Sequence, residues 1–272
     1  MTHSMDERCR KAAEQMRLLS TDFDGTLYAE FEPVPVAPEA ESLLGDLQRA
    51  GSLWAINTGR DLSSLVEAMG RSGLRPRPDY LVVVEREIYR HDGARYVAWE
   101  EWNRECTKAH RELFARLRPE VPRLVSWMEN RFPVTVYEDP YSPLCVIAQG
   151  QEATDAIEAE LQHFAEGLPG LMVVRNDVYL RFSHERYHKG SALSAIAERH
   201  GIGADATVAA GDHLNDLPML ARDRAAMLIA PGNAVEAVKE RVRSQGGYVS
   251  TQTCGRGLAR GLEAWMDRVL RP

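Results

Sequence analysis

The chain has 272 residues and a formal net charge of −7 at neutral pH, with 44% apolar and 27% charged residues. Globular proteins average about 45–50% apolar and about 25% charged residues, so this composition excludes a largely disordered chain and a fibrous repeat. No apolar run approaches the roughly 20 residues that a membrane-spanning helix requires, and the N-terminus lacks the apolar segment typical of a secretory signal. We therefore expect a cytoplasmic globular protein without a membrane partner.

The charge and cysteine patterns argue against two further classes. Phosphate backbones are bound by clustered Lys and Arg, and here the basic residues are dispersed among acidic ones, so we expect no nucleic-acid partner. Structural zinc sites and disulfide frameworks need closer or more numerous cysteines than the four present, which are Cys9, Cys106, Cys145 and Cys254. We expect reduced, packed thiols. Whether the protein is a monomer or a dimer stays open.

The first third of the chain alternates strands and helices. A strand at Met16–Ser20 leads into a polar loop, and a helix from about Pro38 follows a Pro-rich connection. A second strand, Leu53–Asn57, precedes a helix that begins near Asp61. The continuous apolar run over residues 80–84 is typical of a strand that is buried on both faces of a parallel sheet.

The last third has the same alternation. A helix follows Lys189, and strands are predicted at Thr207–Ala210 and Met227–Ala230. A helix from Asn233 and a final helix with an apolar stripe over residues 258–269 complete the chain, and we assign that stripe to core packing. The first and last thirds together predict a parallel sheet covered by helices.

The middle of the chain differs, because its strands are not separated by regular helical crossovers. The expected elements are a helix over 106–117, strands over 124–127, 134–137 and 144–148, a helix over 153–164, and a hairpin of strands 172–175 and 178–182 around Asn176-Asp177. We therefore predict an α/β protein in which a Rossmann-like parallel-sheet core, residues 1–87 and 187–272, is interrupted by an α+β cap domain, residues 88–186.

Four polar clusters stand near the ends of strands or the start of a helix in the two core segments. They are Asp22–Leu27, Thr58-Gly59-Arg60, Lys189-Gly190 and Gly211–Asp216. Each alone is an ordinary turn, strand end, helix start or loop. In open parallel sheets, however, sites form at the carboxyl ends of the strands. Their joint occurrence predicts one site at that edge.

With these clusters the chain resembles the haloacid dehalogenase superfamily, and most closely its Cof-type and sucrose-phosphatase-like phosphatases. The resemblance rests on the hexapeptide Asp22–Leu27 and the loop Gly211–Asp216, with weaker support from Thr58 and Lys189, and it extends to Pro231–Ala234. It implies an α/β core with a C2-type cap between the second and third motifs. It also implies Mg²⁺-dependent hydrolysis of a small phosphorylated metabolite, which we expect to be a sugar or polyol phosphate.

The resemblance also implies a role for each site residue. Asp22 is the nucleophile and Asp24 the general acid and base; Asp22, the backbone carbonyl of Asp24 and Asp212 bind the metal; Thr58, Lys189 and Asn215 hold the phosphate; and Asp216 positions Lys189 or a metal-bound water. Gly59 and Arg60 complete the expected substrate-binding set, although Arg60 could instead pair with an acidic residue.

Elementary electrostatics supports this assignment. A carboxylate that attacks a phosphate dianion brings like charges together, at a cost of about 4 kcal/mol for one pair 4 Å apart at an effective dielectric constant of about 20. Magnesium and Lys189 would offset most of the charge of Asp22, Asp212 and the substrate. Asp22 and Asp24 are two residues apart, so both can face the same opening while Phe23 turns into the core. Thr58 and the Gly59 amide, near a helix N-terminus, suit phosphate oxygens.

Several alternatives stay open. A phosphomutase or phosphotransferase would share the aspartyl-phosphate, and a relative without catalytic activity could serve as a binding or regulatory module. A dehalogenase would need no metal, and the additional carboxylates argue against it. Many relatives carry an Asn-Gly-Ala turn where this chain has Glu85-Arg86-Glu87, so a hexose phosphate is not assumed. Arg175 and Arg181 could contact substrate or solvent, and the segment before Met16 is an amphipathic helix candidate of unassigned role.

Overall fold

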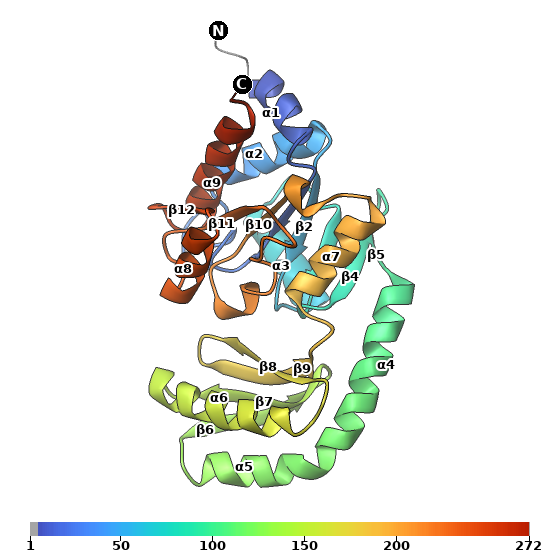
Figure 1. The fold of residues 1–272 in the computed structure, drawn as a ribbon, viewed down its shortest axis with the longest axis vertical. Helices are drawn as coiled ribbons and strands as arrows, with labels where there is room; N and C mark the ends of the chain where they lie inside the picture. Colours follow the sequence, from blue (N-terminus) through green and yellow to red (C-terminus); the bar gives the residue numbers. More distant parts are fainter. Residues whose placement is uncertain (1–4, 272) are drawn as a thin grey trace. The chain divides into compact units, whose positions relative to one another are not determined.

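The computed structural model describes residues 5–271, and these form two compact units (Figure 1). The first unit contains the described residues up to Trp99 and from Lys189 onward, and the second contains Glu100–His188. Each unit has its own sheet. The protein is therefore α/β, with a second, separate sheet in the middle of the chain.

Within residues 5–271, the first unit has an eight-stranded sheet in the order β12-β11-β10-β1-β2-β3-β4-β5. The strands are β1 Leu18–Thr21, β2 Leu53–Asn57, β3 Tyr80–Val83, β4 Glu87–His91, β5 Tyr96–Ala98, β10 Thr207–Ala210, β11 Met227–Ala230 and β12 Tyr248–Val249. The strands from β12 to β3 are parallel, and β4 and β5 add an antiparallel edge. The predicted parallel core is confirmed, and residues 88–98, which we expected in the insert, extend the core sheet.

The helices of this unit are α1 Met5–Ala13, α2 Pro38–Arg49, α3 Leu62–Ser72, α7 Lys189–Arg199, α8 Glu236–Ser244 and α9 Cys254–Val269. Helix α1 packs against α2 and α9, and α9 packs against β11 (Figure 1). The amphipathic helix expected before Met16 is confirmed, because Cys9, Ala12 and Ala13 of α1 are buried. No helix within the described residues has both the length and the apolar character of a membrane span.

The central strands fix where the site can form. Strand β1 lies between β10 and β2, all three run in the same direction, and Thr21 pairs with Ala210 on one side and Ile56 on the other. Every residue of β1 and β10 is buried, as expected for central parallel strands. The loops that follow Thr21, Ala210 and Asn57 therefore emerge at the same edge of the sheet.

The second unit has a four-stranded antiparallel sheet in the order β6-β7-β9-β8. Its elements are α4 Glu100–Leu117, α5 Val121–Glu129, β6 Val134–Asp139, β7 Ser142–Ala148, α6 Gln151–Glu166, β8 Leu171–Asn176 and β9 Tyr179–His184. Its core contains Leu117 and Met128 from the helices and Val146 and Phe182 from the sheet. This is the helix-backed antiparallel sheet that the sequence predicts.

Two local predictions in this unit are wrong in detail. The strand expected over 124–127 is helix α5, because Leu124 and Met128 are one helical turn apart and both are buried, and Pro122 fits a first helical turn. The hairpin forms, but Asn176 pairs with Tyr179, so the turn consists of Asp177 and Val178. Asp177 adopts the left-handed conformation there, with φ of 52°.

The prediction that the cysteine side chains are mostly packed is confirmed. Cys9, Cys106 and Cys145 are buried thiols, and Cys254 is a partly buried one. Burial is the largest of the effects that raise the pKa of Cys9, Cys145 and Cys254. These thiols are therefore less reactive than exposed ones.

Candidate active site

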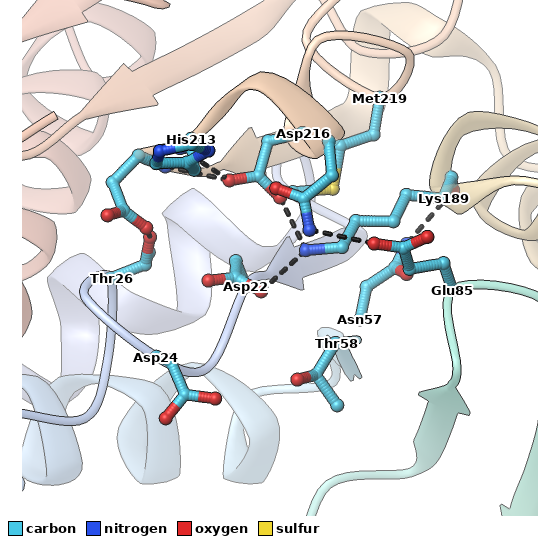
Figure 2. Close-up of polar contacts among 12 residues, drawn as sticks. Asp22, Asp24, Thr26, Asn57, Thr58, Glu85, Lys189, His213, Asp216 and Met219 are labelled. Carbon is cyan, nitrogen blue, oxygen red and sulfur yellow. Dashed lines mark hydrogen bonds and ion pairs between the residues drawn. The ribbon is translucent and has the colours of Figure 1, made fainter. Parts of the chain in front are cut away.

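The candidate site lies in the first unit, at the carboxyl ends of β1, β2 and β10 (Figure 2). The sheet hydrogen bonding continues into the loops that carry the site residues. The N–H of Asp22 donates to the carbonyl of Ala210 at 2.9 Å, and the N–H of Thr58 donates to the carbonyl of Val82 at 2.8 Å. The backbone at Asp22 and Thr58 is therefore as well fixed as the strands themselves.

Lys189 is at the centre of the site. Its side chain is 1% exposed, and its Nζ donates to Oδ1 of Asp22 at 2.6 Å and to Oδ1 of Asp216 at 2.5 Å (Figure 2). Burial acts to lower the pKa of Lys189, but the carboxylates of Asp216, Asp22 and Glu85 outweigh burial and raise it. Lys189 is therefore held as a buried cation.

A buried asparagine anchors the helix that carries Lys189. Nδ2 of Asn57, the last residue of β2, donates to the carbonyl of Lys189 at 2.9 Å. The side chain of Asn57 is fully buried, and its Oδ1 has no hydrogen-bond partner. Sequence reasoning missed this residue; the only signal was a polar residue at the end of an apolar strand.

Asp216 organises the late acidic loop from within. Its Oδ2 accepts hydrogen bonds from the N–H groups of Asp212 at 2.8 Å and His213 at 3.0 Å, while its Oδ1 accepts from Lys189. A Cβ at Gly211 would lie 2.5 Å from Asp216 Cβ, so the loop closes only with glycine there. Asp216 is fully buried. It therefore links the loop to the lysine rather than facing solvent.

Three carboxylates converge in the site. Asp22, Asp212 and Asp216 each offer one oxygen within 4.8 Å of the others, and this cluster within residues 5–271 contains no histidine. Burial raises the pKa of Asp212 to about 7, with a further contribution from the charge of Asp216. Burial also raises the pKa of Asp22, against the opposing effect of Lys189. Both shifts disfavour the charged carboxylates, and a divalent cation bound there would favour them.

The donor set suits magnesium. Mg²⁺ prefers carboxylate and carbonyl oxygens and retains several waters, so it does not need a closed protein cage. Both oxygens of Asp216 already accept hydrogen bonds from protein donors. Asp216 is also fully buried, whereas Asp22 and Asp212 keep some exposure, so Asp22 and Asp212 are the residues that could hold a metal directly.

The carboxylate of Asp212 is oriented by residues from the other motifs. Thr26 Oγ1 donates to Asp212 Oδ1 at 2.8 Å, and Asn233 Nδ2 donates to Asp212 Oδ2 at 3.4 Å and to the carbonyl of Gly25 at 2.8 Å. Gly25 has φ of +74°, and a Cβ there would lie 2.3 Å from Asp212 Oδ2. Thr26 and Asn233 lie in the segments that carry the resemblance, but no role could be assigned to them because Thr26 and Asp212 are 186 residues apart in sequence.

Asp24 is engaged by Arg60. Arg60 Nε donates to Asp24 Oδ2 at 2.7 Å, and Nη2 donates to Oδ1 at 2.6 Å. The guanidinium also lies 5.6 Å from the ring centre of Phe23 and 5.7 Å from that of Tyr28. Figure 2 shows the Asp24 carboxylate directed away from the Asp22–Lys189 pair. Of the two partners that the sequence allowed for Arg60, the structure shows the acidic residue.

Asn215 contacts a residue that departs from the family pattern. Its Nδ2 donates to Glu85 Oε1 at 2.8 Å, and Glu85 is buried. Val84 and Glu85 have φ of 43° and 67°. Non-glycine residues in this left-handed region cost about 1–3 kcal/mol each and tend to cluster at functional sites. Thr58 is buried nearby, and its Oγ1 accepts a hydrogen bond from the N–H of Arg60 at 3.2 Å.

The structure thus brings Asp22, Lys189, Asp212 and Asp216 into one cluster and adds Asn215 through Glu85. In the second unit, Arg175 Nη1 forms ion pairs with Asp155 at 2.7 Å and Glu158 at 2.6 Å, both on α6. Its guanidinium is therefore committed to the packing of that unit.

Comparisons with known proteins agree with this geometry. The sequence profile of the sucrose-6F-phosphate phosphohydrolase family matches residues 15–266. A phosphoglycolate phosphatase of Methanopyrus kandleri is 30% identical over 231 residues, which are 82% of this chain and 87% of that protein.

Solved structures share the fold. The sucrose-phosphatase of Synechocystis, determined with sucrose and phosphate, has a TM-score of 0.68 at 18% identity and covers 92% of this chain and 98% of its own. A haloacid dehalogenase-like hydrolase of Bacteroides thetaiotaomicron has a TM-score of 0.61 at 18% identity, with 91% and 98% covered. The chain belongs to the sucrose-6F-phosphate phosphohydrolase family of the haloacid dehalogenase superfamily, and it is a phosphoric monoester hydrolase.

Proposed function

We propose that this protein is a magnesium-dependent phosphatase that hydrolyses a small phosphorylated metabolite through an aspartyl-phosphate on Asp22. The observation that carries the proposal is the contact of Lys189 Nζ with Asp22 at 2.6 Å, inside a cluster that also contains Asp212. A buried carboxylate beside a fixed cation and two further acids is poorly explained by fold stability alone, because burying charge is costly.

The first half of the reaction is attack by Asp22. One carboxylate oxygen forms a bond to phosphorus while the bond from phosphorus to the substrate oxygen breaks. Asp24 supplies the proton that the leaving oxygen needs. Lys189 lies against Asp22 and offsets the negative charge that accumulates around the phosphoryl group. Magnesium, held by Asp22, Asp212 and the Asp24 carbonyl, would supply further positive charge when bound.

The second half returns the enzyme to its starting state. A water molecule attacks phosphorus, Asp24 accepts a proton from it, and the bond between phosphorus and Asp22 breaks to release phosphate. The same carboxylate therefore serves both proton transfers. In this structure both Asp24 oxygens accept hydrogen bonds from Arg60, so Asp24 must leave this contact and turn toward the substrate for each proton transfer.

The phosphate itself is bound by neutral donors and one cation. Thr58 Oγ1, the Gly59 amide, Lys189 and Asn215 are the proposed contacts. Asp61 caps the N-terminus of α3 directly after this loop, since its side chain accepts from the N–H of Ser64. The positive end of the helix dipole supports an anion there. We assign Arg60 to Asp24 rather than to the phosphate.

The substrate class is a sugar or polyol phosphate. The family description and the relative from Methanopyrus kandleri provide two specific compounds for a screen, sucrose-6F-phosphate and phosphoglycolate. Glycerol phosphates and hexose phosphates complete the panel, and the kcat/KM values rank them.

Hydrolysis of p-nitrophenyl phosphate tests the proposal. We expect the wild-type protein to turn over with Mg²⁺, to lose activity with EDTA and to recover it when excess Mg²⁺ is added. Asp22→Asn should have no measurable activity, whereas Asp92→Asn, which changes an exposed turn between β4 and β5, should match the wild type. Activity in Asp22→Asn, or full activity in EDTA, would show that the mechanism is wrong.

A further inference from the structure

Glu85 places a carboxylate among the proposed phosphate-binding residues. Its Oε1 accepts the 2.8 Å hydrogen bond from Asn215 Nδ2, and a Cβ built on Gly59 would lie 3.5 Å from the same oxygen. Glu85 also contributes to the raised pKa of Lys189. A negative charge in this place opposes the binding of a phosphate dianion, so its presence requires an explanation.

The backbone at Glu85 is held in a conformation that favours glycine. Val84 and Glu85 are consecutive left-handed residues. The N–H of Val84 donates to the carbonyl of Arg60 at 2.8 Å, and the N–H of Glu85 donates to the carbonyl of Thr58 at 2.9 Å. These bonds tie the turn to the Thr58–Arg60 loop. The turn is therefore part of the site, and its strain is maintained by the site.

The chemistry of the contact explains what Glu85 does. A side-chain amide has two N–H donors and one oxygen, and the two ends are nearly equal in shape. A carboxylate only accepts hydrogen bonds, so Asn215 can face Glu85 only with its NH₂ group. The flipped amide would point its oxygen at the carboxylate and is excluded. Glu85 thereby fixes the orientation of Asn215, and the acceptor charge strengthens the bond.

We propose that Glu85 is a positioning residue for phosphoryl binding, which orients the amide of Asn215 so that its second N–H is available to the substrate phosphate. This inference rests on the proposed function, because it takes Asn215 as a phosphate contact. It predicts that glycine at position 85 relieves the backbone and still impairs the enzyme.

The experiment compares Glu85→Gly, Glu85→Gln, Asn215→Ala and the double variant Glu85→Gly/Asn215→Ala. The readouts are the inhibition constant of inorganic phosphate, kcat and KM for p-nitrophenyl phosphate, and Tm. Asp177→Gly is the matched control, since it also replaces a left-handed acidic residue with φ of 52°, but in the β8–β9 turn of the second unit.

We expect Glu85→Gly to keep or raise Tm while the phosphate inhibition constant and KM rise by about tenfold or more, as for the loss of one hydrogen bond to a charged group. Glu85→Gln retains an acceptor oxygen and should stay within about threefold of the wild type. In the Asn215→Ala background, Glu85→Gly should add nothing further. Asp177→Gly should leave all kinetic constants unchanged.

Three results would overturn the inference. They are an unchanged phosphate inhibition constant in Glu85→Gly, an equal loss for Glu85→Gly in the presence and absence of Asn215, or a defect in Glu85→Gln as large as that in Glu85→Gly. These results presuppose that the wild-type protein hydrolyses p-nitrophenyl phosphate. If it does not, the proposed function fails first, and the two failures are thereby distinguished.

Discussion

Arg60 binds the carboxylate of Asp24 through two hydrogen bonds, from Nε at 2.7 Å and from Nη2 at 2.6 Å. The planar guanidinium matches the planar carboxylate, and such bidentate pairs fix direction as well as distance. The rings of Phe23 and Tyr28, which stack on each other, lie 5.6 and 5.7 Å from the guanidinium and restrict it further. Arg60 thereby sets the starting position of Asp24, whose carboxylate must leave this contact to act as the proposed proton donor.

Replacement of Arg60 should therefore impair proton transfer more than phosphate binding. We expect Arg60→Ala to lower kcat for an alkyl phosphate by about tenfold or more, because Arg60 sets the starting position of Asp24, the proposed general acid, and general acid catalysis contributes about 10²–10⁴-fold. The effect on p-nitrophenyl phosphate should be much smaller, since its leaving group needs little protonation. Asp24→Asn gives the largest loss of kcat that the removal of this carboxylate can cause, measured by steady-state kinetics on both substrates. Equal losses on the two substrates would assign Arg60 to the phosphate instead.

Loss of Lys189 should destabilise the fold. Lys189→Met leaves Asp22 and Asp216 buried without their counter-charge, and breaking a buried ion pair costs about 3–5 kcal/mol. We expect a drop of that size in the free energy of unfolding by urea. Lys189→Met/Asp216→Asn should recover part of the loss, because it removes one of the unpaired charges. A wild-type free energy in Lys189→Met would contradict the buried ion network.

A methyl group at Gly25 should damage both the fold and the acidic cluster. Gly25→Ala places a Cβ against Asp212 at a φ of +74°, so Asp212 must move. Gly201→Ala is the control, because Gly201 has φ of +58° with nothing within 4 Å of a Cβ. In this control, the free energy of unfolding should fall only by the cost of a left-handed alanine, about 1–2 kcal/mol. We expect Gly25→Ala to lower the free energy of unfolding by more than this and to bind Mg²⁺ more weakly in a calorimetric titration. Equal stability losses in the two variants, together with unchanged Mg²⁺ binding, would contradict the close approach of position 25 to Asp212.

The cap of α3 should show a defined pH dependence. Hydrogen bonds from the Ser63 hydroxyl and the Ser64 N–H lower the pKa of Asp61. The folded state therefore binds this proton less tightly than the unfolded chain, whose pKa is about 3.9. The stabilisation from the Asp61 cap is therefore fully present above the pKa of the unfolded chain, and it is lost as the pH falls through the lower pKa of the folded state.

This dependence can be isolated by mutation. Asp61→Ala should cost about 0.5–2 kcal/mol near neutral pH, and its difference from the wild type should shrink in acid. Asp61→Asn, which caps without a charge, should keep its stability relative to Asp61→Ala across the same pH range. Urea unfolding at several pH values measures both. A difference between wild type and Asp61→Ala that does not change with pH would contradict the assigned hydrogen bonds.

The parts of the fold that sequence could predict are those with a local signal. The apolar runs of β3 and β11 identify buried parallel strands, and Pro38 marks the start of α2. Helix α5 also has a helical signal in the spacing of Leu124 and Met128, which its short apolar run obscures. The short edge strands β4 and β5 have little apolar alternation, and their place depends on pairing with β3.

The site residues that sequence could predict are likewise those that lie in local motifs. The acidic doublet at Asp22 and the loop at Asp212 are sequence motifs, and the structure places them in one cluster. The partners of Asp24 and Asn215 were not predictable, because Arg60 and Glu85 reach them through space. Asn215 and Glu85, for example, are 130 residues apart in the chain. The sequence around a carboxylate in a turn does not identify the distant amide to which it is bound.

The central claim is that Asp22 carries the phosphoryl group between the two halves of the reaction. Acid quenching of the wild-type protein during turnover, followed by peptide mass mapping, tests it most directly. We predict that a phosphoryl group appears on the peptide that contains Asp22 and is absent in Asp22→Asn. Turnover without any phosphorylated peptide, or phosphorylation that persists in Asp22→Asn, would contradict the account.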